Sequence, residues 1–171
     1  LEGSALSIEY EAVSDADTVL NLTNHAYFNL SGEGEGTTED HILTHHADAY
    51  TAVDGNGLTV EKVIPVAGTP FDFRSPKAIG KDIGADDEQL RNGGGYDHNF
   101  VLDPSGSLKE IAEAVSPKTG VRMRVLTTQP GVQLYTGNSI TTPQTGKNGH
   151  VYGRRSGFCL ETQHFPNGMA C

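Results

Sequence analysis

The 171-residue sequence contains no tryptophan and only two cysteines, Cys159 and Cys171. Two cysteines are too few for a disulfide scaffold, their spacing fits no zinc-binding motif, and they are compatible with a reducing compartment. No apolar run approaches the roughly 20 residues that a membrane-spanning helix needs. Without tryptophan, a module that stacks its ligand on indole rings is disfavoured. We therefore expect a cytoplasmic protein with no membrane partner.

Basic residues are scarce, because 12 Lys and Arg stand against 22 Asp and Glu, which gives a net charge of −10. A negative field of this size repels phosphate groups, so nucleic acid and anionic membrane surfaces are poor partners. A neutral small molecule meets no such repulsion. The charge therefore favours an uncharged ligand, and it leaves the oligomeric state open.

Sustained helical periodicity is also absent, whereas turn-forming residues are common, with 21 glycines and eight prolines. Alternation of apolar and polar residues predicts short strands. They lie at 6–12, 18–25, 41–46, 63–66, 99–102, 108–115, 121–127, 132–135 and 158–162. One turn of helix is expected at 86–91. No linker divides the chain, so we expect one domain with an all-β sandwich or barrel architecture.

Three segments with the alternation of a strand carry an ionisable side chain on their less apolar face. Period-two alternation gives this position to His25, to Asp97 and to Glu161. Rigid strands are good platforms for positioned acid–base groups. Spacing alone favours a hydrogen-bonded or solvated structural role for each of the three residues, and alternation does not show that they converge.

Six segments of the chain, in order, resemble the motifs of one known family. They are Asn21–Gly32, Ala47–Thr51, Val66–Arg74, Gly95–Leu102, Gln129–Asn138 and Leu160–Pro166. The sequence resembles the aldose 1-epimerase (galactose mutarotase) family, and the matching segments span nearly the whole chain. The resemblance implies a large antiparallel β-sandwich, incomplete in this chain.

The resemblance implies an isomerase that interconverts the α and β anomers of free aldoses such as galactose or glucose. The family's catalytic base falls on Glu161, its general acid on His25 and its sugar-orienting aspartate on Asp97. These types suit the chemistry, because a carboxylate can accept the C1 hydroxyl proton and an imidazole can protonate the ring oxygen. Asp97 can accept hydrogen bonds from sugar hydroxyls. No metal and no organic cofactor is expected.

The chain also departs from the family pattern. The family places an Arg and a second His upstream of its central motif, and residues 1–20 contain neither. Only five residues follow Pro166, whereas the family chain continues through further strands. We therefore expect residues 1–171 to be a single partial domain, truncated at both ends, and this fragment alone to be inactive.

Three other functions stay open beside the leading one. The first is a non-catalytic carbohydrate-binding domain on the same fold, and the second is a hexose-6-phosphate epimerase, which the charge does not support. The third is a glycoside hydrolase, for which Asp97 and Glu161 would be the carboxylate pair. Retention of all three site residues favours the epimerase.

Several other residues are expected to be structural. Strand spacing puts His41 and His45 on one face and His46 on the other, which disfavours a metal cluster. Packing roles are expected for His98 and His164. Cys159 has no evident histidine partner, so we interpret it as a buried spectator. Asp72 and Arg74 are interpreted as an ion pair that stabilises a turn.

Overall fold

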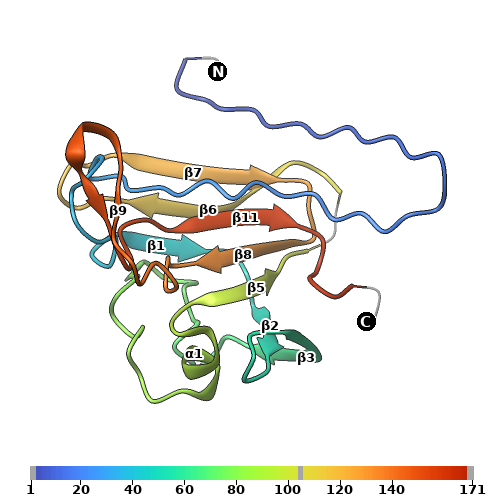
Figure 1. The fold of residues 1–171 in the computed structure, drawn as a ribbon. Coiled ribbons are helices and arrows are strands. Elements are labelled where there is room, and N and C mark those ends of the chain that lie inside the picture. The colour runs from blue at the N-terminus through green and yellow to red at the C-terminus, as the bar shows by residue number, and fades with distance from the viewer. Residues whose placement is uncertain (1–2, 104–105, 169–171) are drawn as a thin grey trace.

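The computed structural model describes residues 3–103 and 106–168, so Cys171 lies outside the described part. Antiparallel strands dominate it, which confirms the all-β prediction (Figure 1). The strands are β1 (Ile42–His45), β2 (Ala49–Val53), β3 (Thr59–Pro65), β4 (Lys77–Ala78), β5 (Asp97–Val101), β6 (Lys109–Val115), β7 (Arg122–Thr127), β8 (Gly131–Tyr135), β9 (Gln144–Thr145), β10 (Val151–Tyr152) and β11 (Cys159–Gln163). Helix α1 spans Glu88–Gly93, and a 3-10 turn spans Lys147–Gly149.

Two main sheets form the sandwich. One has the strand order β4-β1-β6-β7 and the other β11-β8-β5-β2-β3, and a small β10-β9 pair lies beside them. Leu43 and Ile111 from the first sheet belong to the same buried cluster as Phe100 and Leu134 from the second. Apolar residues on the two inner faces therefore make one core, as expected for packed sheets.

The second sheet provides a platform because its strands alternate strictly. Leu160 lies opposite Leu134, which lies opposite His98, and all three are buried in the core. Their sequence neighbours must then point to the other face, since the side-chain period of a strand is two. Polar residues of three separate strands are gathered on that outer face.

Local signals fix the short helix α1 and the chain's return into β5. The Asp87 side chain accepts hydrogen bonds from the backbone N–H groups of Gln89 and Leu90, and Gly94 ends the helix at φ 66°. Gly95 follows at φ 142°, where an added Cβ would lie 2.4 Å from Asn138 Oδ1. Only glycine allows this close approach, which brings the chain directly into Asp97.

Two predicted strands, 6–12 and 18–25, are wrong. Residues 6–27 run as an extended segment outside the sheets, in blue in Figure 1, and form no strand. Leu6, Ile8 and Tyr10 are exposed in spite of their alternation. Alternation supplies an apolar face, but a strand also needs a partner for its backbone N–H and C=O groups. No described strand pairs with this segment.

Other boundaries differ in smaller ways. β2 was not predicted, because four of its five residues are buried and the segment is apolar on both faces rather than alternating. The short strands β4, β9 and β10 were also missed, and β3 begins at Thr59 rather than at residue 63. In the described ranges, no helix has the length and apolar character needed to cross a membrane.

Candidate functional site

The outer face of β11, β8 and β5 carries two adjacent rows of side chains. In one row Glu161 lies opposite Gln133, which lies opposite Asn99. The neighbouring row consists of Cys159, Tyr135 and Asp97. Sequence alternation predicted that Asp97 and Glu161 leave the apolar faces of their strands, and the register confirms that arrangement.

His25 approaches this face from the unpaired N-terminal segment. Its Nε2 lies 3.2 Å from Glu161 Oε1, and its Nδ1 lies 3.5 Å from Cys159 Sγ. The imidazole side chain is 50% exposed, whereas the Glu161 side chain is only 10% exposed. The pair therefore joins a solvent-accessible imidazole to a buried carboxylate, and the contact is an ion pair when the imidazole is protonated.

Two aromatic rings flank the histidine. The His25 ring lies 5.1 Å from the Tyr27 ring and 5.8 Å from the Tyr135 ring, measured between centroids. Burial first, and then nearby acidic groups, raise the pKa of Tyr27 to about 12. Tyr27 is therefore neutral near pH 7, and the two rings limit the directions in which the imidazole can turn.

The segment that carries His25 is anchored at two points on the second sheet. Phe28 and Phe158 exchange backbone hydrogen bonds of 2.8 and 3.0 Å. Further upstream, the Asn21 side chain donates to the backbone oxygen of His164 and accepts from its N–H. These contacts replace the ladder that a regular strand would have supplied.

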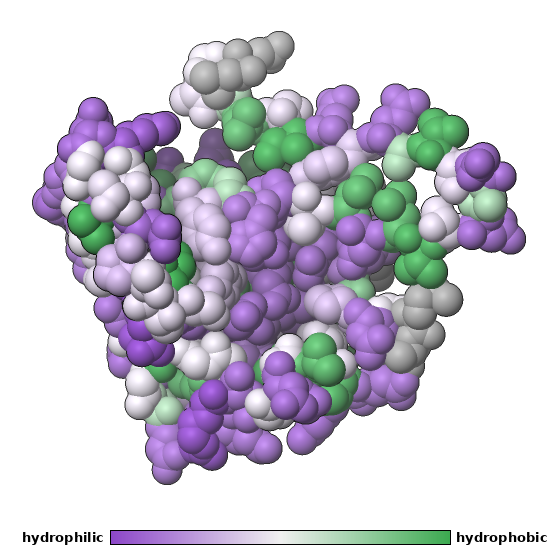
Figure 2. Space-filling view, in the orientation of Figure 1, coloured by the Kyte–Doolittle hydropathy of each residue, from purple (hydrophilic) through white to green (hydrophobic). Residues whose placement is uncertain are grey.

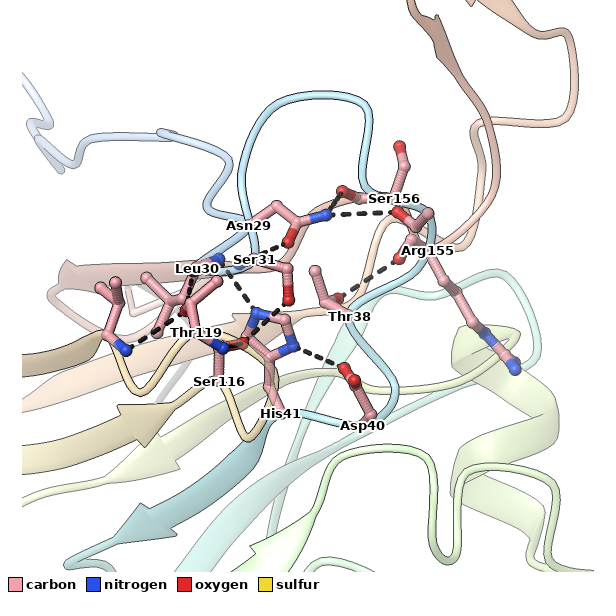
Figure 3. A network of polar contacts seen from close by, with 12 residues as sticks. Asn29, Leu30, Ser31, Thr38, Asp40, His41, Ser116, Thr119, Arg155 and Ser156 are labelled. Carbon is pink, nitrogen blue, oxygen red and sulfur yellow. Dashed lines mark hydrogen bonds and ion pairs between the residues drawn. The ribbon is translucent and has the colours of Figure 1, made fainter.

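A polar clamp made of Leu30, His41 and Asp40 holds the chain just after this segment (Figure 3). The Leu30 N–H donates to His41 Nε2 over 2.9 Å, and His41 Nδ1 lies 2.9 Å from Asp40 Oδ1. Because Nε2 accepts, the neutral ring carries its proton on Nδ1 and donates it to Asp40. The backbone oxygen of Leu30 accepts from Thr119 Oγ1 over 2.8 Å.

Asp97 lies two strands away from β11 and is held by its neighbour. Gln133 Nε2 donates to Asp97 Oδ1 over 2.7 Å. Gln133 also lies directly opposite Glu161 in the strand register, so it sits between the two carboxylates. Sequence reasoning did not select Gln133, although the same alternation places it on this face and it lies within the motif Gln129–Asn138.

Burial dominates the electrostatics of both carboxylates. Desolvation raises the pKa of Glu161, and negative charge on Asp97 raises it further, while His25 lowers it. Desolvation likewise raises the pKa of Asp97, opposed by the hydrogen bond from Gln133 and by His25. The site therefore holds two partly desolvated acids beside one imidazole, an arrangement typical of acid–base centres.

Cys159 contacts a histidine, contrary to the sequence-based interpretation. The thiol is buried as expected, but it does have a histidine partner, since Nδ1 of His25 is 3.5 Å away. Spacing along the chain could not reveal this contact, because 134 residues separate the two. Burial raises the pKa of the Cys159 thiol, so it is not an activated nucleophile.

A cavity of about 480 Å³ opens beside Glu161. Gln133 and Gln163 also line it, together with Leu58 and Thr59 from the β2–β3 side. Its size lies within the range of small-molecule sites. The middle of this face of the molecule is hydrophilic (Figure 2). An uncharged polar ligand would find hydrogen-bond donors and acceptors here from three strands.

The remaining histidines have structural positions. His41 and His45 are buried on one side of β1 and His46 is exposed on the other, which confirms the predicted alternation. His98 packs on Phe71 in the core, as expected. His164 is exposed, so its predicted packing role is wrong.

Asp72 and Arg74 form the predicted ion pair, 2.8 Å between Arg74 Nη2 and Asp72 Oδ2. Arg74 also reaches Asp48 at 3.0 Å. Both contacts are solvent-exposed, so they stabilise the local turn only modestly.

Comparisons with known proteins agree on one family. Residues 1–170 match the family model described as Aldose 1-epimerase. Galactose mutarotase of Rattus norvegicus is 43% identical over 169 residues, which is 99% of this chain and 48% of that protein. Aldose 1-epimerase of Escherichia coli is 39% identical over 168 residues, 97% of this chain and 47% of that protein.

Solved structures give the same answer. The crystal structure of galactose 1-epimerase from Lactobacillus acidophilus superposes with a TM-score of 0.72 at 36% identity, covering 90% of this chain and 43% of that chain. An aldose epimerase homologue from C. elegans gives a TM-score of 0.70 at 31% identity. The chain spans about half the length of the curated relatives it matches.

Proposed function

The chain belongs to the aldose 1-epimerase family, and from that premise we propose that the whole protein interconverts the α and β anomers of free aldoses such as galactose or glucose. In this proposal Glu161 is the base, His25 the acid and Asp97 the residue that orients the sugar. The observation that carries it is the contact of 3.2 Å between His25 Nε2 and Glu161 Oε1 beside a cavity of about 480 Å³.

The reaction needs two proton transfers in opposite directions. The Glu161 carboxylate takes the proton of the C1 hydroxyl, and the protonated imidazole of His25 gives a proton to the ring oxygen as the C1–O5 bond breaks. The open-chain aldehyde then rotates about C1–C2. On closure, the C5 hydroxyl returns its proton to His25 while Glu161 protonates the new C1 oxygen, so both residues end as they began.

The buried side of the site supports this division of roles. Desolvation makes the ionised form of Glu161 a stronger proton acceptor, since the raised pKa reflects a greater affinity for a proton. Exposure of His25 lets its imidazole exchange protons with solvent between turnovers. Gln133 fixes the orientation of Asp97, which leaves the second carboxylate oxygen to accept from a sugar hydroxyl.

The proposal also includes the ligand and the cellular location of the protein. The ligand is a small neutral aldose, the location is the cytoplasm, and the proton transfers require no cofactor. The cavity lining contains no Lys or Arg among the described residues, which disfavours a hexose 6-phosphate as substrate. Glucose 6-phosphate offered in place of glucose should therefore equilibrate no faster than in buffer.

The test is the substitution Glu161→Gln in the whole protein. It preserves the shape of the side chain and removes the base, so mutarotation followed by polarimetry should fall by about 10²- to 10⁴-fold while galactose binding survives. Glu61→Gln, at an exposed position on β3, is the matched control and should keep the wild-type rate. A near-wild-type rate in Glu161→Gln would remove Glu161 from the mechanism.

The carbohydrate-binding alternative predicts a different pair of results. A non-catalytic domain would bind galactose in calorimetry, yet the purified wild-type protein would leave the rate of optical rotation change at the buffer value. A hydrolase would instead release phenol from an aryl glycoside.

A further inference from the structure

The contacts of His25 bring together three side chains that commonly bind metal ions. One ligand atom each from His25, Cys159 and Glu161 lies within 4.8 Å of the other two. Imidazole nitrogen, thiolate sulfur and carboxylate oxygen together suit a borderline-soft cation and are typical ligands of Zn²⁺. In the described ranges this is the one such group of His, Cys, Asp and Glu.

The spacing of two of these atoms already fits a bound ion. A tetrahedral Zn²⁺ with Zn–N of about 2.0 Å and Zn–S of about 2.3 Å holds its nitrogen and sulfur about 3.5 Å apart. His25 Nδ1 and Cys159 Sγ are 3.5 Å apart. A rotation of the Glu161 side chain away from Nε2 supplies the third ligand, and water supplies the fourth.

The surroundings favour a cation and provide access to it. The Asp97 carboxylate lies close enough to act on the charges of Glu161 and Cys159, so an ion meets negative charge from beyond its own ligands. The ring of His25 is half exposed and contacts the buried thiol. Residues 22–27 lie between the two anchors, Asn21 and Phe28, and outside the described strands, so the ring can turn without breaking a described strand pairing. Cys159 is a thiol in the free protein, and the ion displaces its proton to solvent as the Zn–S bond forms.

We propose that His25, Cys159 and Glu161 form an inhibitory Zn²⁺ site that excludes the sugar reaction while it is filled. The inhibition rests on the proposed function, because the ion occupies the side chains assigned there as acid and base. The binding itself does not, since it needs only the three ligand atoms. The ion is thus a regulator of the site and takes no part in the interconversion of anomers.

The test uses the chelator-treated whole protein and Co²⁺ as a spectroscopic probe for Zn²⁺. Titration should give one equivalent of binding, a thiolate-to-Co²⁺ charge-transfer band in the near ultraviolet, and the intense visible bands of a tetrahedral ion. Zn²⁺ should displace Co²⁺. Without sugar present, these signals report the site alone.

Two cysteine variants identify the ligand. Cys159→Ser should abolish the charge-transfer band and weaken Zn²⁺ binding by at least tenfold, because loss of even an indirect support of a ligand costs about 10- to 100-fold. Cys171→Ser should retain both, and His46→Gln controls for adventitious binding at an exposed imidazole. If Cys159→Ser fails to fold, as judged by circular dichroism, Glu161→Gln should weaken Zn²⁺ binding similarly.

Mutarotation measured with and without Zn²⁺ separates the proposed metal site from the proposed function. Zn²⁺ should slow mutarotation of α-galactose reversibly, chelation should restore it, and Cys159→Ser should resist Zn²⁺ relative to its own metal-free rate. A band that persists in Cys159→Ser, or no saturable Co²⁺ binding, overturns the metal site. Normal Co²⁺ binding to a protein with no mutarotation would instead overturn the proposed function and leave the metal site standing.

Discussion

Acid should destabilise the protein through two histidines buried in its core. His45 is 1% exposed and stacks on Phe100 at 4.5 Å, and neither of its ring nitrogens has a hydrogen-bond partner among residues 3–103 and 106–168. Desolvation, with a smaller contribution from His46, lowers the pKa of His45 from 6.5 to about 3. Desolvation also lowers the pKa of His98 to about 4, against an opposing effect of Asp87.

The pH dependence of the free energy of unfolding is set by the difference in proton binding between the folded and unfolded chains. Below pH 6.5 the unfolded chain binds a proton at each histidine that the folded chain refuses, so the free energy of unfolding falls as pH falls. Each site loses about 1.4 kcal/mol per pH unit until its folded pKa is reached. At pH 5 each histidine therefore costs about 2 kcal/mol, and the pair about 4 kcal/mol, relative to pH 7. Asp97 and Glu161, whose pKa values are raised, act in the opposite direction at lower pH.

The substitution His45→Phe isolates one of these contributions. It removes the ionisable ring and keeps an aromatic surface against Phe100, while every other titrating group is common to both proteins. Urea unfolding followed by circular dichroism should show that the free energy of unfolding falls by about 2 kcal/mol less in His45→Phe than in the wild type between pH 7 and pH 5. Gln144→Ala, at an exposed and non-titrating position on β9, is the control and should show the wild-type pH dependence. Equal decreases in wild type and His45→Phe would refute the assignment of a buried neutral His45.

Three further predictions concern the site and its supports. His25→Asn in the whole protein should lower kcat more than it raises KM for galactose, because ring-oxygen protonation matters mainly as the bond breaks; a change in KM alone would make His25 a binding residue. His41→Ala leaves the Leu30 N–H without its acceptor and should cost about 1–3 kcal/mol in urea unfolding, with a lower kcat if the clamp positions His25. Gly95→Ala puts a Cβ 2.4 Å from Asn138 Oδ1 at φ 142° and should cost about 1–3 kcal/mol; an unaltered unfolding midpoint would contradict that strain.

The sequence by itself determined the fold class, the family and the strand face of two of the three candidate site residues. Period two is a property of each strand alone, so it could predict that Asp97 and Glu161 leave the apolar faces of β5 and β11. In the structure, Leu160, Leu134 and His98 form one buried row on the inner face of β11, β8 and β5. Asp97 and Glu161 therefore both lie on the outer face of that sheet. The net charge of −10 is likewise a property of the sequence alone.

Tertiary structure decided where His25 lies and what it touches. The alternation of residues 18–25 predicted a strand, yet no strand in the described part of the chain pairs with this segment. The Phe28–Phe158 bridge and the His41 clamp hold the chain just after it instead. The contact of His25 with Cys159 joins positions 134 residues apart. Such a contact depends on which strands pair and on which segment covers them. Local periodicity carries no information on either, because it describes one element at a time.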